Sequence, residues 1–106
     1  VNALVEDVGR AESAPIILTT EWIAASRIAM RLGTGKDIFL VERLVTRERL
    51  GEPSLLPPLG GRTVYLCLPL RERRDVAQYL QRLERQAVRK EIIYKTARLV
   101  ILKWTY

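Results

Sequence analysis

The chain has 106 residues, of which 48% are hydrophobic, and it carries a formal net charge of +6. This length suits one compact domain, residues 1–106, and is too short for two ordinary domains. The sequence contains no histidine, so it lacks the commonest general base and nitrogen metal ligand, and its one cysteine cannot form an internal disulfide. We therefore predict a non-enzymatic protein with no catalytic residues, no bound metal and no cofactor.

Several features of the sequence concern location. No apolar run is long enough to span a bilayer, and residues 1–14 lack the pattern of a signal peptide. We therefore predict a cytoplasmic protein without membrane contact, and Cys67, within an apolar run, fits a buried small hydrophobe in a reducing compartment. Residues 1–14 show no period and predict a flexible arm. The basic residues are 14 Arg and 4 Lys, which fits a thermophilic source or a GC-rich genome.

The first predicted elements are a short strand, a helix and a second strand. Residues 16–18 are β-prone, and Thr19 or Thr20 then supplies the N-cap of a helix that Gly33 ends. Residues 38–45 are rich in branched and aromatic side chains, which predicts a mostly buried strand.

A long loop and a third strand follow. Prolines and glycines forbid regular structure through most of residues 46–61, although one helical turn near residues 47–50 is compatible with the pattern. Loops of this length are often functional, and a disordered surface excursion is an equal alternative. The leucines of this segment predict that part of it packs against the domain. Apolar and other side chains alternate over residues 62–69, which predicts a strand that Pro69 ends.

Residues 70–90 predict one long amphipathic helix. At about 100° per residue, one arc is apolar and faces the core; it holds Val76, Tyr79, Leu80, Leu83 and Ala87. The opposite arc is an arginine stripe made of Arg71, Arg74, Arg82, Arg85 and Arg89. Asp75 with Gln78 resembles a capping box, so an alternative is a later start with the first turn as loop.

The chain ends in sixteen β-prone residues, 91–106, without glycine or proline. Both alternating faces are apolar at their centres, so such a strand is either central and covered on both sides or meets a partner subunit or stacked bases. A break near Lys95 or Thr96 would instead split it in two. Because a chain of this size has little to cover both faces, we predict a homo-oligomer, most simply a two-fold dimer through residues 98–106.

The predicted order of elements is strand, helix, strand, long loop, strand, helix, strand. This βαββαβ order predicts an α+β fold, a ferredoxin-like sandwich whose four-stranded, mainly antiparallel sheet carries two helices on one face.

The charge distribution carries the functional prediction. Residues 1–61 have seven basic and eight acidic side chains, whereas residues 62–106 have eleven and four, so the positive excess lies in the C-terminal part. We predict a non-catalytic nucleic-acid binding protein that favours single-stranded DNA or RNA, because arginines grip phosphates and aromatic rings stack on bases. The predicted binding residues are Arg71, Arg74, Arg82, Arg85, Arg89, Lys95, Arg98, Lys103, Tyr65, Tyr94, Trp104 and Tyr106.

Each of these residues also has a purely structural interpretation. Helix arginines often only solvate a surface, and a tryptophan such as Trp104 is more often part of a core than a stacking platform. The alternative function is an assembly or adaptor protein that self-associates through its C-terminal strand and binds an acidic protein. No small-molecule substrate is evident. Nucleic-acid binding should weaken steeply with salt, whereas an apolar self-interface should hold.

Overall fold

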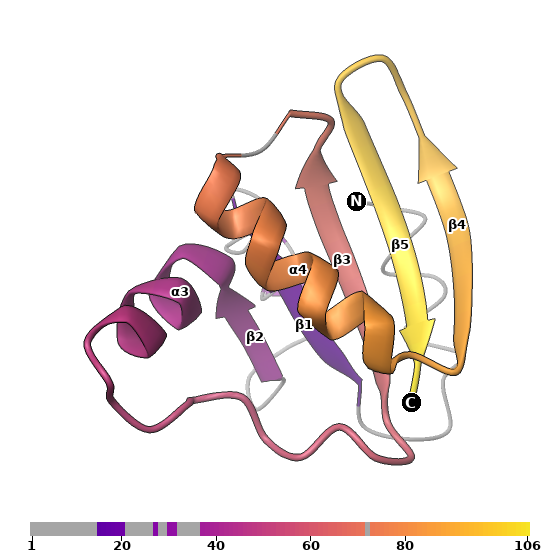
Figure 1. Cartoon of the computed structure of the whole chain (residues 1–106). Helices are drawn as coiled ribbons and strands as arrows, with labels where there is room; N and C mark the ends of the chain where they lie inside the picture. Colours follow the sequence, from indigo (N-terminus) through magenta and orange to yellow (C-terminus); the bar gives the residue numbers. More distant parts are fainter. Residues whose placement is uncertain (1–14, 21–26, 28–29, 32–36, 72) are drawn as a thin grey trace.

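The computed structural model describes residues 15–20, 27, 30–31, 37–71 and 73–106. These residues form a five-stranded mixed sheet, and two helices lie over one of its faces (Figure 1). The α+β class predicted from the sequence is therefore confirmed. The predicted N-terminal arm and most of the predicted first helix lie outside the described residues.

The sheet joins strands from across the chain. Its strands are β1 (Ile16–Thr19), β2 (Asp37–Leu40), β3 (Thr63–Pro69), β4 (Arg89–Lys95) and β5 (Leu99–Thr105), and the helices are α3 (Val41–Arg49) and α4 (Arg74–Gln86). The order across the sheet is β2-β1-β3-β5-β4. Strand β1 runs parallel to β2 and β3, whereas β5 runs antiparallel to β3 and β4. The predicted ferredoxin-like sheet is thus matched only in part, since it had four strands and mainly antiparallel pairing.

The fifth strand exists because the C-terminal run is divided. A turn at residues 96–98 separates β4 from β5, and the Thr96 hydroxyl accepts hydrogen bonds from the backbone N–H groups of Arg98, at 3.2 Å, and Leu99, at 3.0 Å. The Thr96 N–H donates to the Leu99 carbonyl at 2.8 Å. The alternative of a break near Lys95 or Thr96 is therefore confirmed, and the two halves form a hairpin.

The predicted strand over residues 38–45 is wrong in its second half. Strand β2 stops at Leu40, and Val41 begins α3 at once. Val41, Leu44 and Val45 are buried, with 0%, 3% and 8% of their surface exposed. Their spacing is that of one helix face, so a short apolar run that fits a strand also fits this helix.

Helix α4 is shorter than the predicted helix over residues 70–90. Arg73 is its N-cap in an extended conformation, and the chain is extended again at Ala87. The alternative of a later start is closer to the structure, and the Asp75 carboxylate accepts a hydrogen bond from the Val76 N–H at 2.9 Å. Arg71 consequently precedes the helix, and Arg89 belongs to β4. The predicted apolar arc is confirmed at Val76, Tyr79, Leu80 and Leu83, which are buried.

The central strands of the sheet are buried on both faces, and β5 contributes to both core clusters. On the helix side, Leu66, Leu80 and Trp104 belong to one core cluster; on the other side, Ile101 belongs to a second. The predicted burial of Cys67 is confirmed, since it lies in the second cluster with 2% of its surface exposed.

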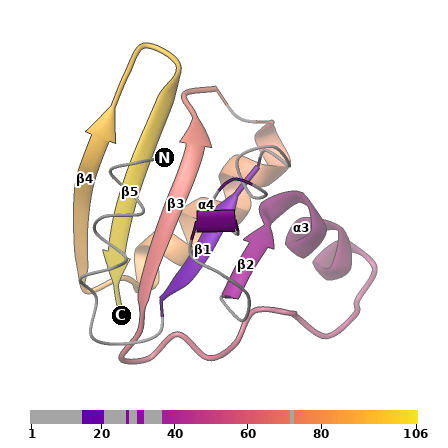
Figure 2. The ribbon, with the colours of Figure 1, turned by 180° about the vertical axis from the view of Figure 1, so that it is seen from behind.

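Figure 2, seen from behind, shows β5 between β3 and β4. Strand β5 is therefore an inner strand, and Ile101 and Trp104 on its two faces are buried, while the predicted dimer through residues 98–106 stays a prediction. No helix in the part of the chain described here is long and apolar enough to cross a membrane.

Candidate nucleic-acid interface

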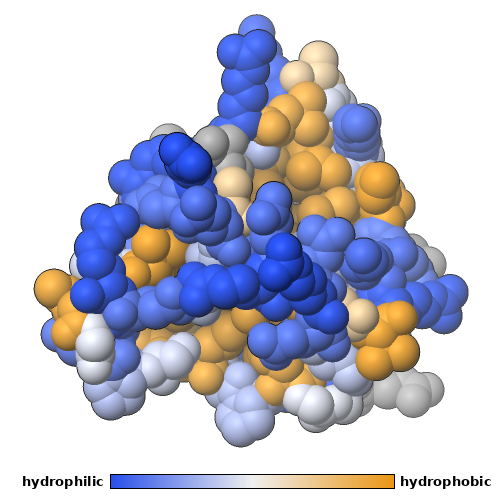
Figure 3. Space-filling view, in the orientation of Figure 1, coloured by the Kyte–Doolittle hydropathy of each residue, from blue (hydrophilic) through white to orange (hydrophobic). Residues whose placement is uncertain are grey.

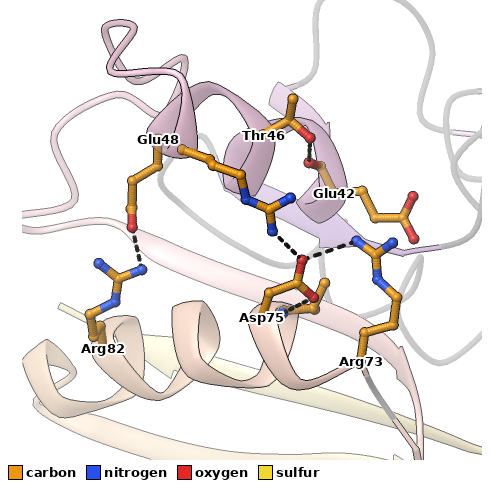
Figure 4. A network of polar contacts seen from close by, with 8 residues as sticks. Glu42, Thr46, Glu48, Arg73, Asp75 and Arg82 are labelled. Carbon is orange, nitrogen blue, oxygen red and sulfur yellow. Dashed lines mark hydrogen bonds and ion pairs between the residues drawn. The ribbon is translucent and has the colours of Figure 1, made fainter.

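Ion pairs join α3 to α4, and one of them occupies Arg82, a member of the predicted arginine stripe (Figure 4). The Arg82 guanidinium lies 2.5 Å from the Glu48 carboxylate of α3 and stacks 5.5 Å from the centroid of the Tyr79 ring. Arg49 of α3 pairs in turn with Asp75 of α4 at 2.8 Å. The helix sequence predicts an almost wholly basic arc, but α3 supplies a carboxylate to it from 34 residues away.

Asp75 is the acceptor at the start of α4. Its partial burial acts to raise the pKa of its carboxyl, but the Val76 N–H, the hydrogen bond from Arg49 and the charges of Arg73 and Arg49 outweigh that effect and lower the pKa. Arg73 lies 3.4 Å from the same carboxylate. Asp75 therefore stays ionised at neutral pH and holds two arginines in place.

Two further cations, Arg89 of the predicted stripe and its neighbour Lys90, also have acidic partners. The Arg89 Nε lies 2.7 Å from Glu91 on the same strand, and the Lys90 Nζ lies 3.2 Å from Glu84 of α4. Arg85, in the last turn of α4, is exposed and has no carboxylate partner among the described residues. Of the predicted stripe, only Arg74 and Arg85 are thus both helical and unpaired within the described part of the chain.

Four predicted cations instead gather at one end of the sheet, which we name the basic end: Arg71, Arg74, Lys95 and Arg98. They come from the segment after β3, the start of α4 and the β4–β5 hairpin, which lie at the same end of the molecule in Figures 1 and 2. The Leu70 N–H donates to the Arg98 carbonyl at 3.2 Å, which joins two of these segments.

The side chains of the basic end are exposed and lack acidic partners within the described part of the chain. Glu72, the acid within this stretch of sequence, is not among the described residues. Arg73, which the sequence analysis did not single out, lies beside them as the N-cap of α4. The run of three arginines between 71 and 74 was the signal that could have identified it.

The predicted aromatic residues do not share one surface. Tyr65 and Trp104 are core residues with 0% and 4% of their surface exposed, which corrects their predicted role as stacking platforms. Lys103 lies on the Tyr65 side of the sheet, with its Nζ 5.7 Å from the centroid of that ring. Tyr94 is 45% exposed and directly precedes Lys95 of the basic end. Only Tyr94 among the predicted aromatics is therefore an exposed ring next to these cations in the chain, although it pairs in register with Ile101 on the far face of the sheet and Lys95 with Val100 on the helix side.

Tyr106 has a structural role at the other end of α4. Its hydroxyl donates a hydrogen bond to the Leu83 carbonyl at 2.6 Å. Burial, and then the nearby Glu84 and Tyr79, raise the pKa of Tyr106 to about 12. The neutral phenol of Tyr106 therefore links the residue after β5 to α4 through this hydrogen bond.

The long loop does pack against the domain, as its leucines predicted. Leu56 and Leu59 are partly buried against the helix-side core, whereas Leu55 is 46% exposed. A groove of about 680 Å³ lies between this loop and α4, and the Arg82–Glu48 pair lines it. No three His, Cys, Asp or Glu side chains of the described residues are grouped so that they could hold a metal ion.

The chain matches no protein-family model, and the comparisons with curated proteins and with solved structures gave no match. The geometry of its own residues is therefore the basis for a functional proposal.

Proposed function

We propose that the protein is a non-catalytic nucleic-acid binding protein that holds single-stranded DNA or RNA at the basic end. The observation that carries this proposal is the placement of Arg71, Arg74, Lys95 and Arg98 at one end of the sheet, on separate segments and without an acidic partner among the described residues. Surface cations that only maintain solubility are usually mixed with acids, as they are elsewhere on α4.

The chemistry of these side chains suits a phosphate backbone. Arginine presents a planar fork of donors that matches phosphate oxygens, and several such contacts release counterions, which supplies most of the affinity of non-specific binding. Tyr94, the neighbour of Lys95 in the chain, adds an exposed ring on the opposite face of the edge strand β4, and a ring can stack on any unpaired base of a strand that passes around this edge. A duplex keeps its bases stacked inside, so the Tyr94 contact favours single strands.

The proposal is tested by two double variants with the same change in net charge. Arg71→Gln with Arg98→Gln removes two cations of the basic end, whereas Arg85→Gln with Arg89→Gln removes two exposed cations elsewhere. Fluorescence anisotropy with a labelled oligothymidylate, its RNA counterpart and a duplex, at several salt concentrations, gives the affinity and its salt dependence for each protein.

We expect the first double variant to bind all sequences more weakly, and its salt slope should fall by roughly 0.7 for each phosphate that the protein no longer neutralises. The control variant should bind nearly as well as the parent protein. Equal weakening in both variants would mean that overall charge alone attracts the nucleic acid, and parental affinity in both would reject the basic end as a binding site.

The alternative function is a non-enzymatic assembly or adaptor protein. The predicted two-fold dimer stays a prediction that light scattering at micromolar concentration tests. The specific observation that favours a protein partner is an uncovered apolar area of the sheet around Ile92 and Leu102, which adjoins the basic end at Lys95.

A further inference from the structure

The helix layer is too narrow for the sheet beneath it. Neighbouring strands lie about 4.8 Å apart and a helix with its side chains is about 10 Å wide, so one helix covers roughly two strands. Two helices can therefore cover at most about four of the five strands, which leaves at least part of the β5–β4 side of the sheet without a helix. In Figure 1, α3 lies towards β2 and α4 crosses the sheet diagonally to the Trp104 end of β5, and no helix of the described residues lies over the rest of the β5–β4 hairpin.

The uncovered face is apolar. Ile92 of β4 is 65% exposed and pairs in register with Leu102 of β5, which is only partly buried. A hollow of about 300 Å³ lies here between α4 and β4, and Ile92, Leu102 and Trp104 line it. Figure 3 shows apolar surface in this region, to the right of α4, bordered by hydrophilic side chains. We name Ile92, Leu102 and the adjoining Val100 the hairpin face.

The charges around the hairpin face are uneven. At one end, Lys90 is paired with Glu84 and Arg89 with Glu91, so the cations there are compensated. At the other end the face meets Lys95 and Arg98 of the basic end, which have no acidic partner among the described residues. An occupant therefore needs an apolar stripe and negative charge beside the basic end.

We propose that the hairpin face docks an amphipathic helix of a partner protein, with acidic residues around its apolar stripe, as a third helix beside α4. Strand β5 has seven residues, or about 23 Å, which matches a helix of about 15 residues. A second copy of this chain fits less well, because it would bring another basic end to the surface. Nucleic acid fits less well because the lining is aliphatic, whereas bases stack on aromatic rings.

The probe is a labelled synthetic peptide of about 15 residues, the length that spans β5, with leucines at helical i, i+3, i+4 and i+7 spacing and glutamates elsewhere. A matched peptide carries lysine in place of glutamate. The variant is Ile92→Lys, and the control is Leu50→Lys, because Leu50 is 66% exposed at the C-cap of α3. In Figure 1, α3 and the β5–β4 hairpin lie on opposite sides of α4. Anisotropy gives the affinities, and methyl NMR spectra of the parent protein locate the contact.

We expect the acidic peptide to shift the Ile92 and Leu102 methyl signals, and Ile92→Lys to weaken its binding about tenfold or more. Leu50→Lys should change the affinity less than about twofold, and the lysine peptide should not bind. Absence of acidic-peptide binding, or shifts confined to other methyl groups, would overturn the proposal. Ile92 shifts that appear without peptide when the protein concentration is raised would also overturn it, because the occupant would then be a second copy. Shifts caused by oligothymidylate alone would do the same, because the occupant would then be nucleic acid.

Discussion

Arg82 of α4 is held by Glu48 of α3, so one arginine of the predicted phosphate-binding stripe is neutralised by a carboxylate of the same molecule. The two side chains remain 55% and 48% exposed, which places the pair at the surface between the helices. An exposed pair of this kind adds little to stability, but it decides which cations remain for a polyanion.

We expect Arg82→Gln to lower the free energy of unfolding by no more than about 1 kcal/mol, because exposed ion pairs contribute about 0.2–1 kcal/mol. Binding of oligothymidylate should stay close to that of the parent protein, since the charge that is removed was compensated. Urea unfolding and anisotropy measure the two quantities, and Glu48→Gln completes a double-mutant cycle. A fall in affinity as large as that of the Arg71→Gln and Arg98→Gln variant would show that Arg82 leaves Glu48 to bind phosphate.

Leu83→Ala tests the buried face of α4. Leu83 is 8% exposed and belongs to the helix-side core, so its truncation leaves a cavity and should cost about 2–5 kcal/mol of unfolding free energy. Arg85→Ala, two residues away on the exposed side, should cost less than about 0.5 kcal/mol because alanine is a strong helix former. Chemical denaturation measures both variants, and similar costs for the two would contradict the orientation of the helix.

The parts of the fold that the sequence predicted are those with a clear period. Alternation identified β3, and the 3.6-residue period identified the buried arc of α4 from Val76 to Leu83. The boundary between β2 and α3 was missed because the apolar residues on either side of Leu40 form a short run that fits either element. The fifth strand depended on the turn at Thr96, whose side chain closes it without glycine or proline.

The sequence predicted which cations the candidate site contains, but not which of them are neutralised or lie at the same end of the sheet. Which arginines are neutralised depends on α3, because the Glu48–Arg82 contact joins residues 34 positions apart. The basic end depends on the hairpin, which brings Arg98 beside Leu70. Burial likewise distinguishes the aromatic residues, since Tyr65 is buried in the core and Tyr94 is exposed at the surface. Local sequence patterns carry none of these tertiary relationships.

Tyr106 should make stability depend on alkaline pH. Its folded pKa is raised to about 12 by burial, Glu84 and Tyr79, whereas an unfolded tyrosine titrates near pH 10. The neutral phenol therefore stabilises the fold fully below about pH 10, and this contribution is lost as pH rises from about 10 to 12. Thermal unfolding at about pH 9 and about pH 11, on either side of the unfolded pKa, should show the parent protein losing more stability than Tyr106→Phe.

The Tyr106→Phe variant also lacks the hydrogen bond to Leu83, so near pH 9 it should be less stable by about 0.5–1.5 kcal/mol. Tyr94→Phe is the matched control, because it also removes one phenol hydroxyl but does so at an exposed position. A gap between the parent and Tyr106→Phe that does not narrow above about pH 10 would contradict the role given to the Tyr106 phenol.

Trp104→Ala should act on folding rather than on binding. Trp104 is 4% exposed and packs in the helix-side core, so its truncation should cost about 3–5 kcal/mol of unfolding free energy. Circular dichroism during urea unfolding measures this cost. A variant that folds with parental stability but binds single strands less well would restore Trp104 as a stacking residue.

Tyr94→Ala should show the opposite behaviour. Tyr94 is 45% exposed on the edge strand β4, so its truncation should change the unfolding free energy little compared with Trp104→Ala. If the ring stacks on a base at this edge of the sheet, its removal should cost roughly 1–3 kcal/mol of affinity for a single strand. The salt slope should not change, because every phosphate-binding cation is still present, and duplex affinity should stay the same. Anisotropy at several salt concentrations separates these outcomes: an equal weakening for single strand and duplex, or a changed slope, would mean that Tyr94 only positions the neighbouring cation.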